Sequence, residues 1–394
     1  MATTSTGIME LPAEITDSII DCLYDDRQTL KSCALTHPTW LDRSRYHLHH
    51  SVNIDGSADT DKLIGYYETG AAAYIQNLTL IAPPESYSVH RGGHMSLRAQ
   101  SVWRTASRFT NITSLNMTFF NWRGQHKSYD RIAHIARHVT HLNLVLSTFR
   151  DVADFLSFLS VFPALEALTL GTLTFSCASS WGAGYSPHSD DELLQHLATP
   201  AGQALRSVSF SNTHPCPQMA EQLGKWLGRL PAQVVPRSSL TWTGAGSIQG
   251  LIHALRGLGG NLAHLELDTV SAERLAYEGD NVLRSNTAVE TLVFRDLQYI
   301  ARDEVQWLLV LLSQLVPAAL RKVVFVCTAS CFEGVDEHSL ELLDEFLSAP
   351  VFSALEEVAI QFGHTSHQKE IDGMVKRGLQ RLDKRNALKP VFLA

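Results

Sequence analysis

The chain has 394 residues, of which 45% are hydrophobic, so it is long enough to bury a large core. Its net charge of −8 argues against a nucleic-acid partner held by attraction to phosphate. No apolar run reaches the roughly eighteen residues that a membrane span requires. Residues 1–10 carry no secretory signal and the six cysteines show no paired framework, so we expect a protein of the cytoplasm, the nucleus or both.

Three short helices are predicted over residues 10–50. The apolar residues of the first helix recur at every fourth position, on one face, at Leu11, Ile15, Ile19 and Leu23. Asp25-Asp26 offers an N-cap oxygen for a second helix that carries Leu30 and Cys33, and Pro38 begins a third helix with Trp40. So small a unit cannot hide this much apolar surface within itself, which predicts a partner.

The order of these residues resembles the F-box of fungal-type F-box proteins. The resemblance is carried by Leu11-Pro12-x-Glu14, Ile19, Leu23, Leu30, Cys33 and Trp40. It implies a receptor subunit that binds the Skp adaptor, and through it a cullin scaffold, in a Skp–cullin–F-box ubiquitin ligase. The residues expected to bind the adaptor are Leu11, Pro12, Ile15, Ile19, Leu30, Leu35 and Trp40. His37-Pro38 departs from the family, in which many members carry Cys-Arg or Cys-Lys. A plain helical cap on a larger domain is the alternative interpretation.

After residue 50 a short apolar pattern recurs, as in Leu165/Leu168/Leu170. The clear copies begin at Ile75, Ile112, Val139, Leu165, Leu205, Leu262, Val289, Leu320 and Leu355, with a weaker copy at Leu240/Trp242. Apolar and variable residues alternate within each copy, which indicates a half-buried strand, and segments of helical period such as 151–161 and 305–315 lie between copies. A strand-plus-helix unit that repeats at this interval resembles leucine-rich repeats.

We therefore predict an α/β protein with four parts. Residues 1–9 are expected to be a disordered N-terminus and 10–50 the F-box. Residues 51–365 form an irregular leucine-rich-repeat solenoid with a parallel concave sheet and convex helices, and 366–394 form a C-terminal capping helix and tail. The Asn or Cys that the repeat family often carries after the strand is missing. An eight-fold βα barrel is the rival, but its strands are buried on both faces, whereas polar residues such as Asn143 and Thr169 interrupt these strands.

The sequence predicts no catalytic residue, no metal site and no cofactor. It contains no GxSxG elbow, HExxH pair or paired CxxC, and its glycine-rich pieces lack the Lys-Ser/Thr ending of a phosphate loop. His134 and His138 stand four apart on a predicted helix, but no further ligands lie at a suitable spacing. An α/β enzyme would need a convergent pocket of titratable groups that the sequence does not indicate.

The predicted function is therefore recognition of a target protein, whose identity the sequence does not give. Two inserts carry residue types that dominate protein interfaces, and a small polar ladder on the concave strands is the other candidate. The candidate target-binding residues are Arg91, Arg98, Trp103 and Arg104 in the insert 83–107, Trp181 and Tyr185 in the insert 176–188, and Ser209, Thr241 and Glu266 on the ladder, with further charge at His264, Asp268 and Arg295. The alternative function is a leucine-rich-repeat interaction scaffold that takes no part in ubiquitin transfer.

Overall fold

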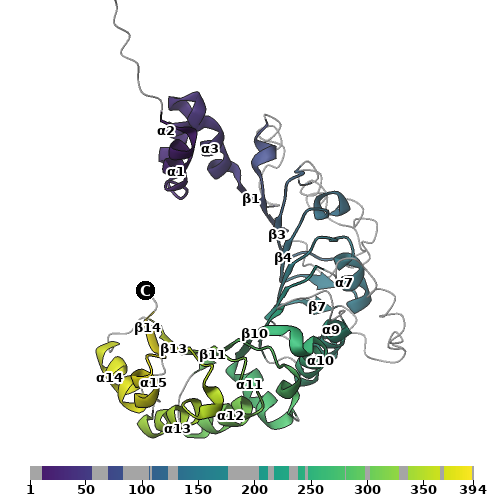
Figure 1. The fold of residues 1–394 in the computed structure, drawn as a ribbon. Coiled ribbons are helices and arrows are strands. Elements are labelled where there is room, and N and C mark those ends of the chain that lie inside the picture. The colour runs from purple at the N-terminus through teal and green to yellow at the C-terminus, as the bar shows by residue number, and fades with distance from the viewer. Residues whose placement is uncertain are drawn as a thin grey trace, which may run out of the picture.

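The structure, a computed structural model, describes residues 11–55, 70–82, 106, 109–122, 132–175, 204–211, 217–229, 238–244, 247–279, 281–297, 302–327, 336–363 and 368–392. Figure 1 shows these parts as an arc, with three helices at its N-terminal end and strands along its inner side. The three helices are α1 (Ala13–Asp21), α2 (Arg27–Thr36) and α3 (Pro38–His49). The predicted disordered segment 1–9 lies outside the described residues.

A single large sheet of twelve parallel strands runs through the rest of the chain. Each strand lies beside the strands that precede and follow it in this sheet. They are β1 (Ser51–Asp55), β2 (Asn77–Ile81), β3 (Ser114–Thr118), β4 (His141–Val145), β6 (Ala167–Gly171), β8 (Ser207–Ser211), β9 (Ser238–Thr243), β10 (Leu262–Asp268), β11 (Thr291–Leu297), β12 (Lys322–Cys327), β13 (Glu357–Phe362) and β14 (Leu388–Phe392). The short strands β5 (Thr148–Phe149) and β7 (Thr174–Phe175) form a second small sheet.

Helices cover the outer side of the arc and close the core against the strands (Figure 1). The α-helices are α7 (Val152–Leu159), α9 (Pro217–Arg229), α10 (Ile248–Leu258), α11 (Thr269–Glu278), α12 (Arg302–Ser313), α13 (Glu337–Leu347), α14 (Gln368–Gly378) and α15 (Gln380–Lys384). Short 3-10 turns lie at η1 (Ala71–Tyr74), η5 (Gly259–Asn261), η6 (Val282–Ser285) and η8 (Pro350–Phe352). The predicted α/β class with a parallel sheet is thus confirmed.

Alternation along the strands follows the predicted pattern. Leu142, Leu168, Leu265 and Leu292 are at most 1% exposed, and each belongs to the core that the helices close. The weak copy Leu240/Trp242 is strand β9, with both side chains buried. The chain after 366 differs from the predicted capping helix and tail: α14 and α15 are separate, and β14 adds a strand. The sequence of β14 includes Lys389 and Pro390. Both residue types suit an edge strand, since proline has no N–H to donate to a neighbouring strand and lysine discourages further pairing.

Main-chain hydrogen bonds hold the turns that follow three successive strands. Phe119, Leu146 and Thr172 each follow a strand end with a positive φ of 67°, 50° and 49°. Their amides donate to Val145 at 3.1 Å, to Gly171 at 2.9 Å and to Ser211 at 2.8 Å, each on the next strand of the sheet. The left-handed backbone costs on the order of 1 kcal/mol per residue outside glycine. These bonds continue the ladder where the sequence lacks the Asn or Cys of regular repeats.

The core leucines provide the first test of this architecture. Leu292 is fully buried, so its replacement by alanine should lower the free energy of unfolding by roughly 2–5 kcal/mol through lost burial and the cavity it leaves. Val270→Ala in α11, where the side chain is 48% exposed, should change it by less than about 0.5 kcal/mol. Denaturant unfolding of both variants measures the difference, and equal effects would contradict the predicted core.

Glycines bring α9 and α10 into backbone contact on the outer side of the sheet. A Cβ atom at Gly250 would overlap the main chain at Ala220, and one at Gly224 would overlap the main chain at Gly250. A Cβ at Gly257 would likewise overlap the main chain at Gly228. Any larger side chain at this contact would force the two helices apart.

Gly250→Ala should therefore destabilise the protein by about 1–3 kcal/mol, the usual cost of overpacking. Gly373 in α14 is the matched control, because an added Cβ would meet only the end of Arg377 at 3.5 Å. Gly373→Ala should stabilise the helix by up to about 1 kcal/mol, since alanine is the better helix former. Thermal unfolding of both variants checks the opposite signs, and a gain in stability at Gly250 would rule out the close helix contact.

Candidate functional site

The three N-terminal helices enclose a small core of their own. Its buried members, drawn from all three helices, are Ile20, Leu30, Cys33 and Leu48, with Leu23 and Trp40 packed against them. Side-chain N-caps explain where α2 and α3 begin. Asp26 accepts the amides of Gln28 at 3.1 Å and Thr29 at 3.0 Å, as the sequence predicts for α2. His37 accepts the amide of Thr39 at 3.3 Å, so the departure His37-Pro38 supplies the cap and first residue of α3.

An ionic contact at Asp21 fixes α1 against α3. Arg43 donates through Nε at 2.5 Å and Nη2 at 2.7 Å to the two carboxylate oxygens, and His47 Nε2 lies 2.7 Å from one of them. The hydrogen bonds from Arg43 and then His47 lower the pKa of Asp21 to about 2. This contact orients the helix that carries the exposed apolar residues.

Thr16 and Ile20 of α1 point inward and are buried, whereas other apolar residues in and just before this helix lie on its outer face. Leu11, Ile15 and Ile19 are 56%, 49% and 50% exposed. Nine large hydrophobic residues are exposed in the described part of the chain, and five of them lie within residues 11–35: Leu11, Ile15, Ile19, Tyr24 and Leu35. Apolar exposure is therefore concentrated on this unit, which is the pattern expected of an interaction surface.

The residues predicted to bind the adaptor do not all lie at the surface. Leu11, Pro12, Ile15, Ile19 and Leu35 are exposed, with Leu35 at 89%. Trp40 is half-buried against the small core. Leu30 has no exposed surface, so it supports the helices from within and cannot itself touch a partner. Sequence periodicity could not separate Leu30 from the exposed leucines, because a helix of this size presents apolar residues on both sides.

Hydrogen bonds join the helical unit directly to the sheet. His50 follows α3, and its carbonyl accepts the amides of Gln76 at 3.0 Å and Asn77 at 2.9 Å. Tyr74 donates its hydroxyl to Asp42 of α3 at 3.0 Å. α3 also runs into β1 with only His50 between them. The exposed face of α1 is thus fixed relative to the first strands of the sheet.

The inner face of the sheet carries side chains aligned by the strand register. We call the middle alignment the central row, and its members are Asn53, Thr79, Asn116, Asn143, Thr169, Ser209, Thr241, Glu266, Val293, Val324, Ala359 and Lys389. The row is polar and uncharged from β1 to β9, anionic at Glu266, apolar from β11 to β13, and basic at Lys389 on β14. Val293, Val324 and Ala359 form a buried cluster separate from the main core.

Glu266 lies where the central row changes from polar to apolar. Its carboxylate accepts a hydrogen bond from Arg295 Nε on β11 and lies 3.7 Å from His264 Nε2 on its own strand. The side chain is only 11% exposed. Burial raises the pKa of Glu266, but the neighbouring His264 and the hydrogen bond from Arg295 together outweigh it and hold the pKa below its usual value.

A second carboxylate on the inner face is bound in the same way. Glu357 of β13 lies 2.7 Å from Lys322 Nζ on β12 and 2.9 Å from Lys389 Nζ on β14. Hydrogen bonds from Lys322 first, and then from Lys389, lower the pKa of Glu357. The last five strands of the sheet thus carry two carboxylates, each bridging two basic side chains.

The predicted target-binding residues divide between described and undescribed parts of the chain. Ser209, Thr241 and Glu266 take adjacent places in the central row, as predicted. Arg91, Arg98, Trp103, Arg104, Trp181 and Tyr185 lie outside the described residues. Sequence reasoning missed Lys322, Glu357 and Lys389. Lys322 directly precedes Val323, and Glu357 directly precedes Val358, the second apolar residue of each copy. That position faces the inner side of the sheet, so the repeat pattern could have predicted both residues.

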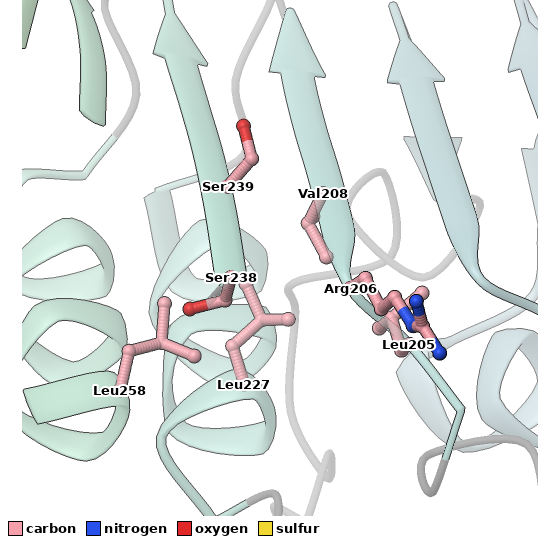
Figure 2. A pocket seen from close by; sticks show the side chains of 7 residues that line it. All are labelled: Leu205, Arg206, Val208, Leu227, Ser238, Ser239 and Leu258. Carbon is pink, nitrogen blue, oxygen red and sulfur yellow. The ribbon is translucent and has the colours of Figure 1, made fainter. Parts of the chain in front are cut away.

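A small cleft in the described part of the chain lies between β8, β9 and the outer helices. Leu205, Arg206 and Val208 line one side, Ser238 and Ser239 another, and Leu227 and Leu258 reach it from α9 and α10 (Figure 2). Its interior volume is about 10 Å³, near the lower limit for holding one water molecule. This cleft is therefore too small for a substrate.

Within the described ranges, no three or more His, Cys, Asp or Glu side chains gather in a way that could hold a metal ion. Over those ranges, too, no helix combines the length and apolar character that crossing a membrane demands. No protein-family model matches the chain, and no curated protein shows significant similarity to it.

The Asp21 contact predicts a pH-dependent stability of the helical unit. Because the folded pKa of about 2 lies below the ordinary 3.8, the contact contributes fully above about pH 4 and is lost as the pH falls toward 2. Asp21→Asn should therefore be less stable than the unaltered protein at pH 6, and the difference should shrink between pH 4 and pH 2. Circular dichroism melts across this range measure it. Arg43→Gln is the control and should reproduce most of the loss; a constant difference at every pH would contradict the role of Asp21.

Proposed function

We propose that the chain is a non-catalytic substrate-recognition subunit of a Skp–cullin–F-box ubiquitin ligase. In this proposal α1–α3 are an F-box that binds the Skp adaptor, and the sheet with its helices is an irregular leucine-rich-repeat solenoid that holds a target protein. The observation that carries the proposal is the exposed stripe Leu11, Ile15 and Ile19 on a three-helix unit at the end of the arc. The one-strand-per-repeat order of the parallel sheet supports the solenoid.

The exposed stripe has the chemistry of a docking face. Full burial of one large aliphatic side chain contributes roughly 1.5–3 kcal/mol, so a partner that covers these three gains several kcal/mol before the costs of association. The internal core of the unit is small, and the outer stripe adds nothing to it. A soluble protein that retains this surface is expected to have it covered in its working complex.

The junction at His50 supports the receptor role. A receptor accelerates transfer by holding the target near the charged ubiquitin-conjugating enzyme, which requires a fixed geometry rather than a catalytic residue. The main-chain bonds from Gln76 and Asn77 to His50, together with the Tyr74–Asp42 bond, give the helical unit a fixed place on the sheet. Such a subunit would act in the cytoplasm or the nucleus.

The stripe on α1 provides the direct test. Ile15→Asp combined with Ile19→Asp places two charges on the exposed face without touching the core, so the chain should fold while adaptor binding falls by a few kcal/mol. The full chain is co-expressed with a Skp adaptor, and the adaptor and cullin that co-purify are quantified by mass spectrometry.

Val270→Asp combined with Tyr277→Asp is the matched control, because both side chains are exposed and lie on one helix, α11, in the sheet region. This control should retain the adaptor. Unaltered adaptor recovery with the α1 variant would refute the proposed docking face. Recovery of neither adaptor nor cullin with the unaltered chain would favour the alternative, an interaction scaffold outside the ubiquitin pathway.

A further inference from the structure

We propose that the inner face of β10–β14 binds an acidic, extended segment of a partner protein through Arg295, Lys322 and Lys389. This inference rests on the proposed function, since it assigns the chemistry of the target segment that the receptor would hold. The residues come from three different strands and are brought to one face only by the register of the sheet.

The basic side chains form the outer layer of this face, and the carboxylates lie beneath them. Arg295, Lys322 and Lys389 are 50%, 41% and 58% exposed, whereas Glu266 and Glu357 are 11% and 22% exposed. A partner approaching the sheet therefore meets positive charge first. The contrast with a chain of net charge −8 makes this layer the natural place for an anionic partner.

The buried carboxylates also orient the basic groups. Glu266 engages Nε of Arg295, which leaves the guanidinium plane fixed for a second anion at its terminal nitrogens, the fork geometry that suits carboxylate and phosphate. Glu357 holds Lys322 and Lys389 on either side of one strand. A side chain that is already ordered loses less conformational entropy when it binds.

The spacing of the basic side chains defines the length of the segment. Arg295 on β11 and Lys389 on β14 are three strand steps apart, or roughly 14 Å at the usual spacing of parallel strands. An extended chain covers that distance in about four residues. From the strand of Arg295 to the strand before Lys389 the central row is apolar, at Val293, Val324 and Ala359. The fitting ligand therefore carries two acidic groups about four residues apart, with uncharged residues between them.

Single-stranded nucleic acid fits this face less well than an acidic peptide. Its binding sites pair a continuous basic groove with aromatic side chains on which bases stack. The central row contains no aromatic residue along its described length, and within the described strands Lys and Arg side chains appear only from β11 onward. We therefore assign the partner as polypeptide.

Binding of defined peptide pools to the purified full chain tests the inference. Fluorescein-labelled decapeptides carry glutamate, phosphoserine, glutamine or lysine at positions 3 and 7, with mixed uncharged residues elsewhere. In fluorescence anisotropy the glutamate pool should bind about tenfold tighter than the glutamine pool. The phosphoserine pool should bind tighter still, because each phosphate carries about −1.5 to −2 charges at neutral pH. The ratio of the affinities of the phosphoserine and glutamate pools shows whether the face prefers phosphate or carboxylate groups. Equal affinity for the glutamate and glutamine pools overturns the inference.

Variants then assign the binding to the proposed side chains. Lys389→Gln leaves Glu357 paired with Lys322, and Arg295→Lys keeps the charge beside Glu266 but removes the fork, so both chains should fold. Each should weaken binding of the glutamate pool by about two- to fivefold, as expected for a partly exposed ion pair. Lys376→Gln on α14, where the lysine pairs with Asp372 at 2.8 Å, is the matched control and should change nothing. Unchanged affinity in both inner-face variants overturns the assignment.

Adaptor recovery from the same preparations separates this inference from the proposed function. Loss of the glutamate preference with normal adaptor recovery contradicts the inference alone. A preserved glutamate preference with no adaptor recovery contradicts the proposed receptor role and leaves the peptide site in place.

Discussion

The register between neighbouring parallel strands is the constraint on which the rest of the structure depends. No single strand and helix of this chain can bury its own apolar face, so each relies on the next copy for its core. Leu142 is paired directly with Leu168, and Leu265 with Leu292. A slip of one residue would turn these leucines to the inner face and bring polar side chains into the core. The same register that closes the core therefore also aligns the central row. Packing of the leucines against the helices thus fixes which side chains lie next to one another on the inner face.

A sheet built by stacking has two ends, and this chain treats them differently. At β1 the chain arrives from α3 through a single residue, and bonds to the His50 carbonyl carry the ladder into β2. At β14 the edge carries Lys389 and Pro390, two residue types that discourage pairing with another chain. The first end thus carries a helical unit with an unburied apolar stripe, and the second is protected. Association through the helices is favoured over association through the sheet edge.

The sequence predicts the class of fold well because the information for it is local and repeated. Alternation around Leu168 or Leu265 is visible in five residues, and ten copies agree with one another. β14 escaped prediction because Lys389 and Pro390 weaken the apolar pattern at an edge strand. The candidate surfaces are less predictable for a different reason. Ile19 and Ile20 are adjacent and chemically identical, yet one is half exposed and the other buried, because the placement of α2 and α3 decides which face of α1 points inward. Lys322, Glu357 and Lys389 come together only through the pairing of three consecutive strands, with more than thirty residues between one and the next.

Glu266 is the one carboxylate among the described residues of the central row, at a position where the next two strands carry valine. The next strand carries Val293 at the same register, and β12 carries Val324, so the sheet accommodates valine at this position and buries it. A largely buried carboxylate incurs a desolvation cost that valine avoids, so Glu266 needs both basic partners beside it. Arg295 and His264 more than offset that cost, because they hold the pKa of Glu266 below its usual value. Valine at this position would be buried as well, but only the carboxylate lets the inner face present an oriented arginine outward.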